Sequence, residues 1–319
     1  MNSCPICKST AAPAVVTASE KMFGTLAQYE YTICPQCGVM LLRDLPEGTG
    51  ALYPDNYYSF TSKVWLSNGI KRLFRRACLK LYGGQNKFAE SLLNKLRKPP
   101  SICEWIRIAR LNSRSRILDI GSGNGCILSA FYNEGFNCLL GIDPNIPEAI
   151  RYGRNFTIEE KSIQEINGCF DFVMANHVLE HIRNQDDFLA QISRVLGQKG
   201  IAMIRIPVKD TYAWRHYGAN WVQLDAPRHR VLHTLPSFKM LVRNNGFEIA
   251  DILFDSTGFQ FWGSEQYEKN IWLTAENSYS VNPGKSLFSS GDIARFELRA
   301  QELNAQKDGD QVCFFLRKV

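Results

Sequence analysis

The chain has 319 residues, of which 45% are hydrophobic and 21% are charged, and its formal net charge is +6. This composition is typical of a globular protein with one large or two unequal domains, and it excludes a disordered tail, a collagen-like repeat and an integral membrane protein. Residues 1–4 lead directly into a cysteine pair without a charged-then-apolar leader. We therefore expect no secretory signal and a reducing, cytoplasmic location.

Two C-x-x-C pairs lie in residues 1–45. Cys4 and Cys7 form the first pair, and Cys34 and Cys37 form the second. Two thiolates at this spacing can reach one ion, and a second pair completes a tetrahedron, which predicts a structural Zn²⁺ site. A redox pair and two disulfides are the alternatives, but they suit a reducing location less well. Because all four ligands are cysteines, the metal is expected to stabilise a small zinc-ribbon module rather than to activate water.

The region from 46 to 112 begins with a turn-rich, aromatic stretch and continues as basic, helix-like sequence. Tyr57 and Tyr58 in the aromatic stretch are predicted either to pack between domains or to cover a substrate. Residues 63–116 contain 14 basic and two acidic residues, a net charge of +12, which leaves −6 for the rest of the chain. The positive charge is therefore concentrated in this region, and it bears on which molecules the region could bind.

Within this region, one predicted helix has an apolar and a basic face. The apolar face carries Ile70, Leu73, Phe74, Ala77 and Leu81, and the basic face carries Lys71, Arg72, Arg75, Arg76 and Lys80. Three interpretations stay open. The helix packs on the main domain with a solvated basic face, residues 63–82 contact an anionic membrane at its inner surface, or the helix binds an anionic substrate or RNA.

Residues 113–319 alternate strand-like and helix-like segments, which predicts a Rossmann-like α/β sheet. About 55 residues separate the last two expected strands, too many for a hairpin, so an insertion at about 256–308 is expected. The expected strands are 116–120, 138–143, 170–175, 201–207, 247–254 and 311–316, and the expected helices are 126–133, 186–196 and 238–245.

A glycine-rich turn follows the first of these strands. Gly121, Gly123 and Gly125 lie between strand and helix, Asp119 precedes them, and Asp143 ends the next strand. Glycines let the backbone approach a ligand, the helix N-terminus offers free N–H groups, and a carboxylate there can accept hydrogen bonds from ribose hydroxyls. The spacing G-x-G-x-G differs from the dinucleotide fingerprint. The pattern predicts a nucleoside-bearing cofactor at the carboxyl ends of a parallel sheet.

These motifs resemble the class I S-adenosylmethionine-dependent methyltransferases over about residues 113–255. Residues 119–125 resemble the first motif of the family, 141–143 its ribose-binding acid, and 170–181 its fourth strand and the turn that follows. The resemblance implies a seven-stranded sheet whose last strand is antiparallel. It also implies that S-adenosylmethionine is bound by Asp119, Gly121, Ser122, Gly123, Asn124, Gly125, Asp143, Pro144, Ser162, Ile163, Asn176 and His177.

The acceptor of the methyl group is suggested by other stretches. Residues 175–178 read Ala-Asn-His-Val, without the Asn/Asp-Pro-Pro-aromatic motif common in methylation of base or amide nitrogens. The cysteine pairs followed by residues 52–59, and the runs 225–230 and 259–267, resemble bacterial methyltransferases of sugar and polysaccharide pathways. The resemblance implies a sugar, nucleotide-sugar or glycan acceptor. An RNA methyltransferase and a non-catalytic cofactor-binding scaffold are the alternatives.

Three residues are candidates for acting on the acceptor. His229 lies in a turn-like stretch after the fifth strand, and loops at that end of a sheet surround the ligand. An ordinary imidazole titrates near pH 6.5, which suits a general base, and His181 is a second candidate. The alternative is that His229 ties its loop down by hydrogen bonds. Arg228 is predicted to grip a phosphate or carboxylate of the acceptor.

Overall fold

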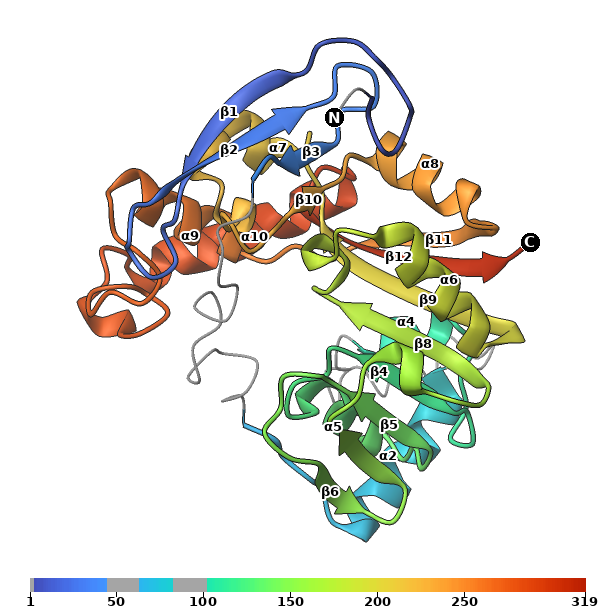
Figure 1. Cartoon of the computed structure of the whole chain (residues 1–319). Helices are drawn as coiled ribbons and strands as arrows, with labels where there is room; N and C mark the ends of the chain where they lie inside the picture. The colour runs from blue at the N-terminus through green and yellow to red at the C-terminus, as the bar shows by residue number, and fades with distance from the viewer. Residues whose placement is uncertain (1–2, 45–62, 83–101) are drawn as a thin grey trace. The chain divides into compact units, whose positions relative to one another are not determined.

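The computed structural model describes residues 3–44, 63–82 and 102–319 (Figure 1). Tyr57 and Tyr58 lie outside the described residues. The chain forms two compact units: unit 1 comprises residues 1–52, 177–186 and 205–314, and unit 2 comprises residues 53–176, 187–204 and 315–319. In the described ranges, no helix has the length and apolar character that would let it cross a membrane.

An eight-stranded sheet forms the α/β region, with the strand order β11-β12-β9-β8-β4-β5-β7-β6. The strand β4 pairs in parallel with β5 and β8, and β5 pairs in parallel with β7, whereas β6 is antiparallel to β7. The predicted mixed α/β fold is confirmed. The strands are β4 (Ile117–Ile120), β5 (Leu139–Ile142), β6 (Ile150–Gly153), β7 (Phe156–Glu159), β8 (Phe170–Asn176), β9 (Leu196–Pro207), β11 (Phe247–Phe254) and β12 (Gln311–Lys318).

The strands β6 and β7 were not among the expected segments, because each has four residues and carries too few apolar side chains for a periodic pattern. The central strands are buried on both faces, as in a parallel sheet between helices. Phe131 on α5 packs on Phe172 of β8, with 6.2 Å between ring centroids. The helices of this region are α2 (Gly69–Tyr82), α4 (Ile102–Ile108), α5 (Cys126–Asn133) and α6 (Gln185–Val195).

A second sheet lies in unit 1 and has the strand order β1-β2-β3-β10. It contains β1 (Ala14–Ser19), β2 (Gln28–Ile33), β3 (Met40–Leu42) and β10 (Val231–Leu232). Antiparallel pairing of β3 with β10 joins the cysteine region to residues nearly 200 positions later. The helices of this unit are α7 (Tyr212–Tyr217), α8 (Leu235–Asn244), α9 (Phe259–Glu268) and α10 (Ser290–Ala305), and the last two occupy the expected insertion.

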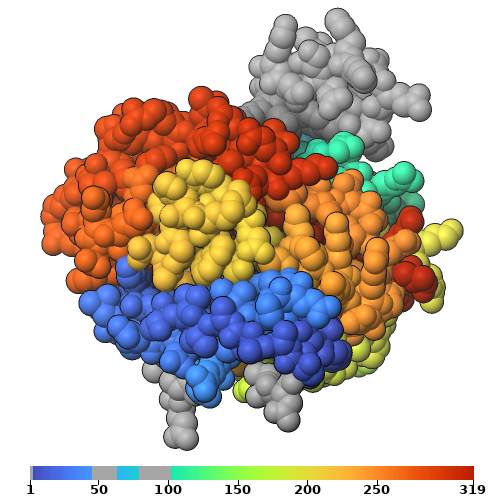
Figure 2. Space-filling view, turned by 90° about the horizontal axis from the view of Figure 1, so that it is seen from above, coloured from blue at the N-terminus to red at the C-terminus, as the bar shows by residue number. Residues whose placement is uncertain are grey.

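One hydrophobic core joins residues 18–42 to residues 213–303. Tyr31 of β2 and Trp221 are both fully buried in it. In Figure 2 the blue surface of the N-terminal residues borders the yellow surface of residues around 215. Three short strands bury too little apolar surface to be stable alone. The cysteine region therefore shares its core with the later chain, so the boundary expected at residue 45 does not separate two cores.

Helix α2 packs with the face opposite to the one expected. Ile70, Leu73 and Phe74 on its apolar side are 82%, 69% and 63% exposed. Arg72 instead faces α5: its guanidinium donates to the backbone oxygen of Tyr132 and lies 3.5 Å from the centroid of that ring. The last carbonyl groups of a helix lack intrahelical partners, and an arginine satisfies them while its aliphatic stem packs.

His233, which directly follows β10, is a fully buried histidine with two side-chain partners. Its Nε2 lies 2.7 Å from Gln185 Oε1, and its Nδ1 lies 2.9 Å from Ser237 Oγ. Gln185 donates its own amide to Leu179, so Oε1 is the atom that accepts from His233. Burial lowers the pKa of His233 to about 3. The imidazole is therefore neutral in the folded chain and takes up a proton readily only after unfolding.

We expect His233 to make the fold acid-sensitive. Because its folded pKa is depressed, its stabilising contribution is complete above pH 6.5 and is lost as the pH falls toward 3, at about 1.4 kcal/mol per pH unit at most. His233→Gln should lower the urea midpoint at pH 7.5 but reduce the further loss between pH 7 and pH 4.5. The control is His216→Gln at an exposed histidine. An unchanged acid-induced loss in His233→Gln would contradict this assignment.

Candidate active site and metal centre

The glycine loop between β4 and α5 adopts a backbone that requires glycine. Gly121, Gly123 and Gly125 have φ angles of 68°, 51° and 84°, in the left-handed region that side chains disfavour. A Cβ atom on Gly125 would also lie 2.6 Å from Ile158 Cδ1. The loop therefore has the close-approach geometry predicted from its sequence.

Two buried polar atoms at this loop lack hydrogen-bond partners within the described residues. They are Asp119 Oδ2 at the middle of β4 and Ser122 Oγ in the loop itself. Burial raises the pKa of Asp119, and the charge of Asp143 raises it further. Leaving such a group unsatisfied costs about 1–3 kcal/mol. The loop therefore fits a polar ligand that would supply the missing hydrogen bonds.

Asp143 follows β5 and fixes the glycine loop. Its Oδ2 accepts a hydrogen bond from Gly123 N and its Oδ1 accepts one from Asn145 N, both at 2.9 Å. A Cβ atom on Gly141 would lie 2.5 Å from Ser122 Oγ. The Asp143 carboxylate and the glycine loop thus lie together at the carboxyl ends of two adjacent parallel strands. Gly141, which has no side chain, leaves room for the loop there.

Other predicted cofactor residues lie on the following loops. The backbone oxygen of Asn124 accepts from Tyr152 Oη at 2.7 Å, and Ser162 Oγ donates to Glu165 Oε2 at 2.7 Å. Ile163 is buried and its carbonyl accepts from Arg194, which sequence reasoning did not single out. Asn176 ends β8, and Pro144 is exposed directly after Asp143.

In unit 1, His177 and Glu180 form a buried hydrogen-bonded pair. His177 Nδ1 lies 3.0 Å from Glu180 Oε1, and its Nε2 lies 2.7 Å from Gln311 Oε1. Burial of Glu180 favours its neutral form, but the hydrogen bond from His177 and the nearby histidines outweigh it and lower the pKa of Glu180 to about 2. Glu180 is therefore a carboxylate at neutral pH, although it is 1% exposed.

His229 lies beside this carboxylate and is 6% exposed. Its Nδ1 donates to the backbone oxygen of Gln223 at 2.7 Å, which leaves the lone pair on Nε2. That Nε2 atom lies 3.9 Å from both Glu180 Oε1 and Asp225 Oδ2. Burial and the neighbouring His181 lower the pKa of His229 to about 4, below the value near 6.5 that the sequence alone suggested.

The structure brings His181, the second candidate, next to His229. Their ring centroids are 4.8 Å apart, and His181 Nδ1 donates to the backbone oxygen of Arg228 at 2.9 Å. The ligand atoms of Glu180, His181 and His229 lie within 4.8 Å of one another. Nδ1 of each ring donates to a backbone oxygen, which leaves Nε2 as the ring atom that could reach an ion.

Arg228 occupies a buried ion-pair cluster. Its guanidinium is 1% exposed, and its Nη2 lies 2.7 Å from Glu20 Oε1 and 2.6 Å from Asp225 Oδ1. This corrects the expectation that Arg228 grips an acceptor, because the group is enclosed and held by two carboxylates. Sequence reasoning missed Glu20, which is separated from Arg228 by 208 positions and belongs to no motif.

The N-terminal region also holds the segment around His229 by hydrogen bonds. Tyr31 Oη donates to the backbone oxygen of His229 at 2.9 Å, and Thr234 Oγ1 donates to that of Cys37 at 2.6 Å. Leu42 N donates to the backbone oxygen of Arg230 at 2.8 Å. The candidate base therefore sits on a segment that the cysteine region orders.

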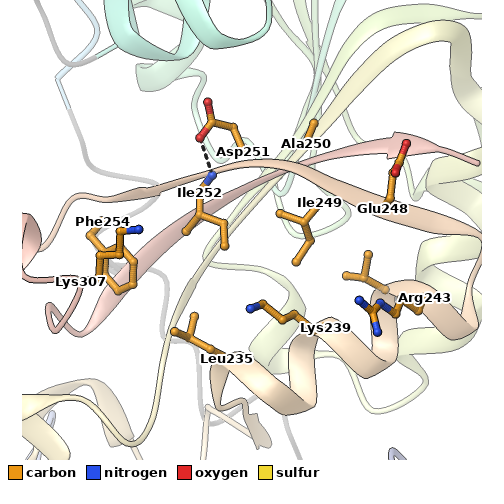
Figure 3. Close-up of a pocket in the computed structure, with 11 residues that line it drawn as sticks. Leu235, Lys239, Arg243, Glu248, Ile249, Ala250, Asp251, Ile252, Phe254 and Lys307 are labelled. Atoms are coloured by element: carbon orange, nitrogen blue, oxygen red, sulfur yellow. Dashed lines mark hydrogen bonds between the residues drawn. The ribbon is translucent and has the colours of Figure 1, made fainter.

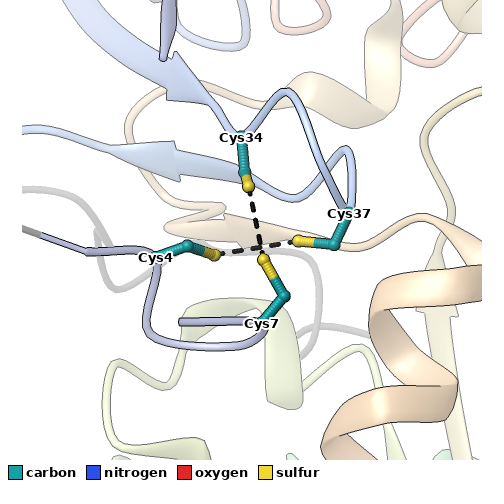
Figure 4. Close-up of side chains that lie close together, drawn as sticks. All are labelled: Cys4, Cys7, Cys34 and Cys37. Atoms are coloured by element: carbon teal, nitrogen blue, oxygen red, sulfur yellow. Dashed lines mark hydrogen bonds between the residues drawn. The ribbon is translucent and has the colours of Figure 1, made fainter. Parts of the chain in front are cut away.

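The four paired cysteines converge on one point (Figure 4). The Sγ atoms of Cys4 and Cys37 are 3.7 Å apart, and those of Cys7 and Cys34 are 3.5 Å apart. Four thiolates at about 2.3 Å from one ion would be about 3.8 Å apart in a tetrahedron. Burial opposes ionisation of Cys34, but N–H groups of Cys37 and Gln36 outweigh it and lower its pKa to about 7. The set fits a tetrahedral metal ion.

A surface hollow of about 620 Å³ lies between α8 and β11 in unit 1. Figure 3 shows Lys239 and Arg243 on α8 opposite Ile249 and Ile252 on β11. None of its lining residues is a predicted cofactor, acceptor or metal residue. We therefore assign the hollow no part in the chemistry of the glycine loop.

The chain is similar to known proteins in the region of the glycine loop. Residues 94–252 match the family model described as a methyltransferase domain. A ubiquinone biosynthesis O-methyltransferase of Rickettsia canadensis is 24% identical over 184 residues, which cover 52% of this chain and 78% of that protein. A tRNA U34 carboxymethyltransferase of Dichelobacter nodosus is 31% identical over 130 residues, covering 34% and 40%. The chain thus spans most of the first relative and two-fifths of the second.

Solved structures of similar fold have lower identity. The cyclopropane synthase MmaA2 of Mycobacterium tuberculosis is 14% identical with a TM-score of 0.44, over 68% of this chain and 84% of that one. The 1,6-didemethyltoxoflavin-N1-methyltransferase of Burkholderia thailandensis is 18% identical with a TM-score of 0.39, over 76% and 91%.

Proposed function

The chain belongs to the class I S-adenosylmethionine-dependent methyltransferases, and we propose that it methylates a hydroxyl group of a sugar, nucleotide-sugar or glycan intermediate. The observation that carries the proposal is the glycine loop, where buried Asp119 Oδ2 and Ser122 Oγ lack hydrogen-bond partners within the described residues and fit a polar ligand. The relative from Rickettsia canadensis is named an O-methyltransferase, which supports a hydroxyl acceptor. The sugar class rests on the resemblance of the motifs outside the glycine loop.

The cofactor site in this proposal is built around Asp143. Its carboxylate would accept hydrogen bonds from ribose hydroxyls, while Asp119 and Ser122 offer the polar atoms that lack partners. S-adenosylmethionine would supply a methyl group activated by its positively charged sulfur. The glycine backbone binds and orients, which leaves the chain little covalent chemistry to perform. The remaining predicted contacts are Gly121, Gly123, Asn124, Gly125, Pro144, Ser162, Ile163, Asn176 and His177.

The proposed base is His229. A neutral imidazole with a free Nε2 lone pair can take the hydroxyl proton as the carbon–oxygen bond forms. Glu180 and Asp225, each 3.9 Å from Nε2, would stabilise the resulting imidazolium. With a pKa of about 4 His229 is a weak base, so alignment of the acceptor must supply much of the rate.

The metal in the cysteine site is proposed to be Zn²⁺ with a structural role. Four thiolates leave no position for a reacting water. Cys34 and Cys37 precede β3, which pairs with β10. The ion would therefore support the segment that carries His229 without taking part in methyl transfer.

The function is tested by comparing metabolites and RNA from cells with and without the gene by mass spectrometry. The proposal expects a sugar-containing metabolite or glycan that is 14 Da lighter when the gene is absent. RNA is the second candidate acceptor, favoured by the named tRNA relative and by the net charge of +12 over residues 63–116. Loss of a methylated nucleoside, together with steeply salt-dependent RNA binding, would replace the sugar proposal by that one.

The first prediction from the proposed function concerns Asp143. Asp143→Ala removes the acceptor of Gly123 N and the proposed ribose contacts, each charge-assisted bond contributing about 1.5–3 kcal/mol. Calorimetry should show S-adenosylmethionine binding weakened at least tenfold. Glu148→Ala, at an exposed carboxylate five residues later, should bind normally. Unchanged affinity in a folded Asp143→Ala protein would mean that the loop has been misinterpreted.

The metal prediction concerns stoichiometry and stability. Elemental analysis should find about one zinc ion per chain. The Cys34→Ser protein should lose this ion and have a lower unfolding midpoint. The reason is that the bound metal stabilises a module too small to be held by its own hydrophobic core. The control is Cys138→Ser, at an exposed free cysteine, which should keep both the zinc ion and the unfolding midpoint. Metal-free protein with all four thiols protected and full stability would refute a structural ion.

A third prediction concerns His229→Gln with the true acceptor. Loss of a general base should lower turnover by about 10²–10⁴ while cofactor affinity is kept. Because the pKa of His229 is about 4, wild-type turnover should lack an inflection near pH 6.5 from this residue and should fall only as the pH approaches 4. His216→Gln is the matched control. A change smaller than threefold would assign His229 to loop structure alone.

A further inference from the structure

Exposed apolar side chains are concentrated on α2 and on the residues before it. Trp65, Ile70, Leu73 and Phe74 are between 63% and 82% exposed, and Leu66 is 41% exposed. Single exposed apolar residues are common on soluble proteins, but five within ten positions form a patch that indicates an interaction site. These five residues are called the α2 patch below.

The patch is held in place by polar contacts on the other side of the segment. Ser67 N donates to Asn133 Oδ1 at 2.7 Å, and Asn133 Nδ2 donates to the backbone oxygen of Trp65 at 2.7 Å. Arg72 adds hydrogen bonds to the carbonyl oxygens of Tyr132, in the last turn of α5, and of Phe136 beyond it. The stem of Arg76 packs at Gly135. Arg72 and Arg76 therefore fix α2 to the methyltransferase sheet region, which leaves the apolar side outward.

Positive charge accompanies the patch. Ile70, Lys71, Phe74 and Arg75 together line a shallow hollow of about 580 Å³, so apolar and cationic side chains share one surface. Residues 63–82 contain six basic residues and no acidic residue. Within the described ranges, no carboxylate forms an ion pair with Lys71 or Arg75. The surface thus combines unpaired cations with bulky apolar groups.

We propose that the α2 patch docks this protein on an anionic lipid surface, with α2 lying in the plane of the interface. Trp, Phe, Leu and Ile side chains would enter the headgroup and acyl boundary, and the flanking Lys and Arg would meet lipid phosphates. A protein partner would need acidic groups as well as an apolar groove to match this surface. Charge complementarity favours the lipid, whose phosphates are available at any position. This docking is separate from the proposed methyl transfer and does not depend on it.

The proposal is tested with the full-length protein and vesicles of phosphatidylcholine alone or with 30% phosphatidylglycerol, by co-sedimentation at several salt concentrations. The wild-type protein should bind the anionic vesicles at least tenfold more tightly than the neutral ones. Ile70→Ser with Phe74→Ser should reduce this binding at least tenfold. Lys71→Glu with Arg75→Glu should abolish the preference for anionic lipid and its salt dependence. Leu298→Ser, at a residue of α10 that is 59% exposed, is the matched control and should bind normally.

Three results would overturn the proposal. One is the absence of binding to anionic vesicles at low salt, and another is unchanged binding of the Ile70→Ser/Phe74→Ser protein. The third concerns other occupants of the patch. Exposed residues should tolerate these substitutions, so a clear fall in the urea midpoint would mean that the chain itself covers the patch. A change in mass by light scattering would mean that a second copy covers it.

Discussion

The buried guanidinium of Arg228 constrains the architecture of unit 1 because it joins residues far apart in the sequence. It pairs with Asp225 three residues away and with Glu20 from the N-terminal region, and all three side chains are largely removed from water. Removing one partner from a buried pair typically costs about 3–5 kcal/mol, because the other charge stays buried. The cluster can exist only if residues near 20 and near 228 are brought together, so it couples the cysteine region to the candidate active segment.

That coupling changes what the cysteine site does in the protein. A four-thiolate site is a structural device, and its influence extends to the residues it orders. Here the carbonyl of Cys37 accepts from Thr234, the phenol of Tyr31 donates to the carbonyl of His229, and β3 pairs with β10. The N-terminal region thus packs against the segment around His229, and loss of its fold would remove these contacts from that segment.

The parts that could be predicted from the sequence are those set by local pattern. The strand at 117–120, the positive φ of Gly121 and the convergence of the four cysteines follow from neighbours a few positions apart, or from a strict metal geometry. The burial of Arg228 could not be predicted, because its partner Glu20 lies 208 positions away. The outward apolar face of α2 depends on the carbonyl groups of Tyr132 in α5 and of Phe136 beyond it. Helical periodicity alone carries no information about these partners.

The low basicity of His229 is a consequence of the same burial that positions it. Desolvation lowers its pKa to about 4, while the backbone oxygen of Gln223 fixes its tautomer. Each pKa unit of lost basicity reduces the driving force for proton removal, by about 1.4 kcal/mol. A rigid ring avoids the entropy cost of orienting a mobile base, which can offset part of that loss. In the proposed mechanism, Glu180 and Asp225 would contribute only after the proton has moved, because their charges stabilise the imidazolium and not the neutral ring. In that proposal the network around the histidine, more than its intrinsic basicity, would set the barrier.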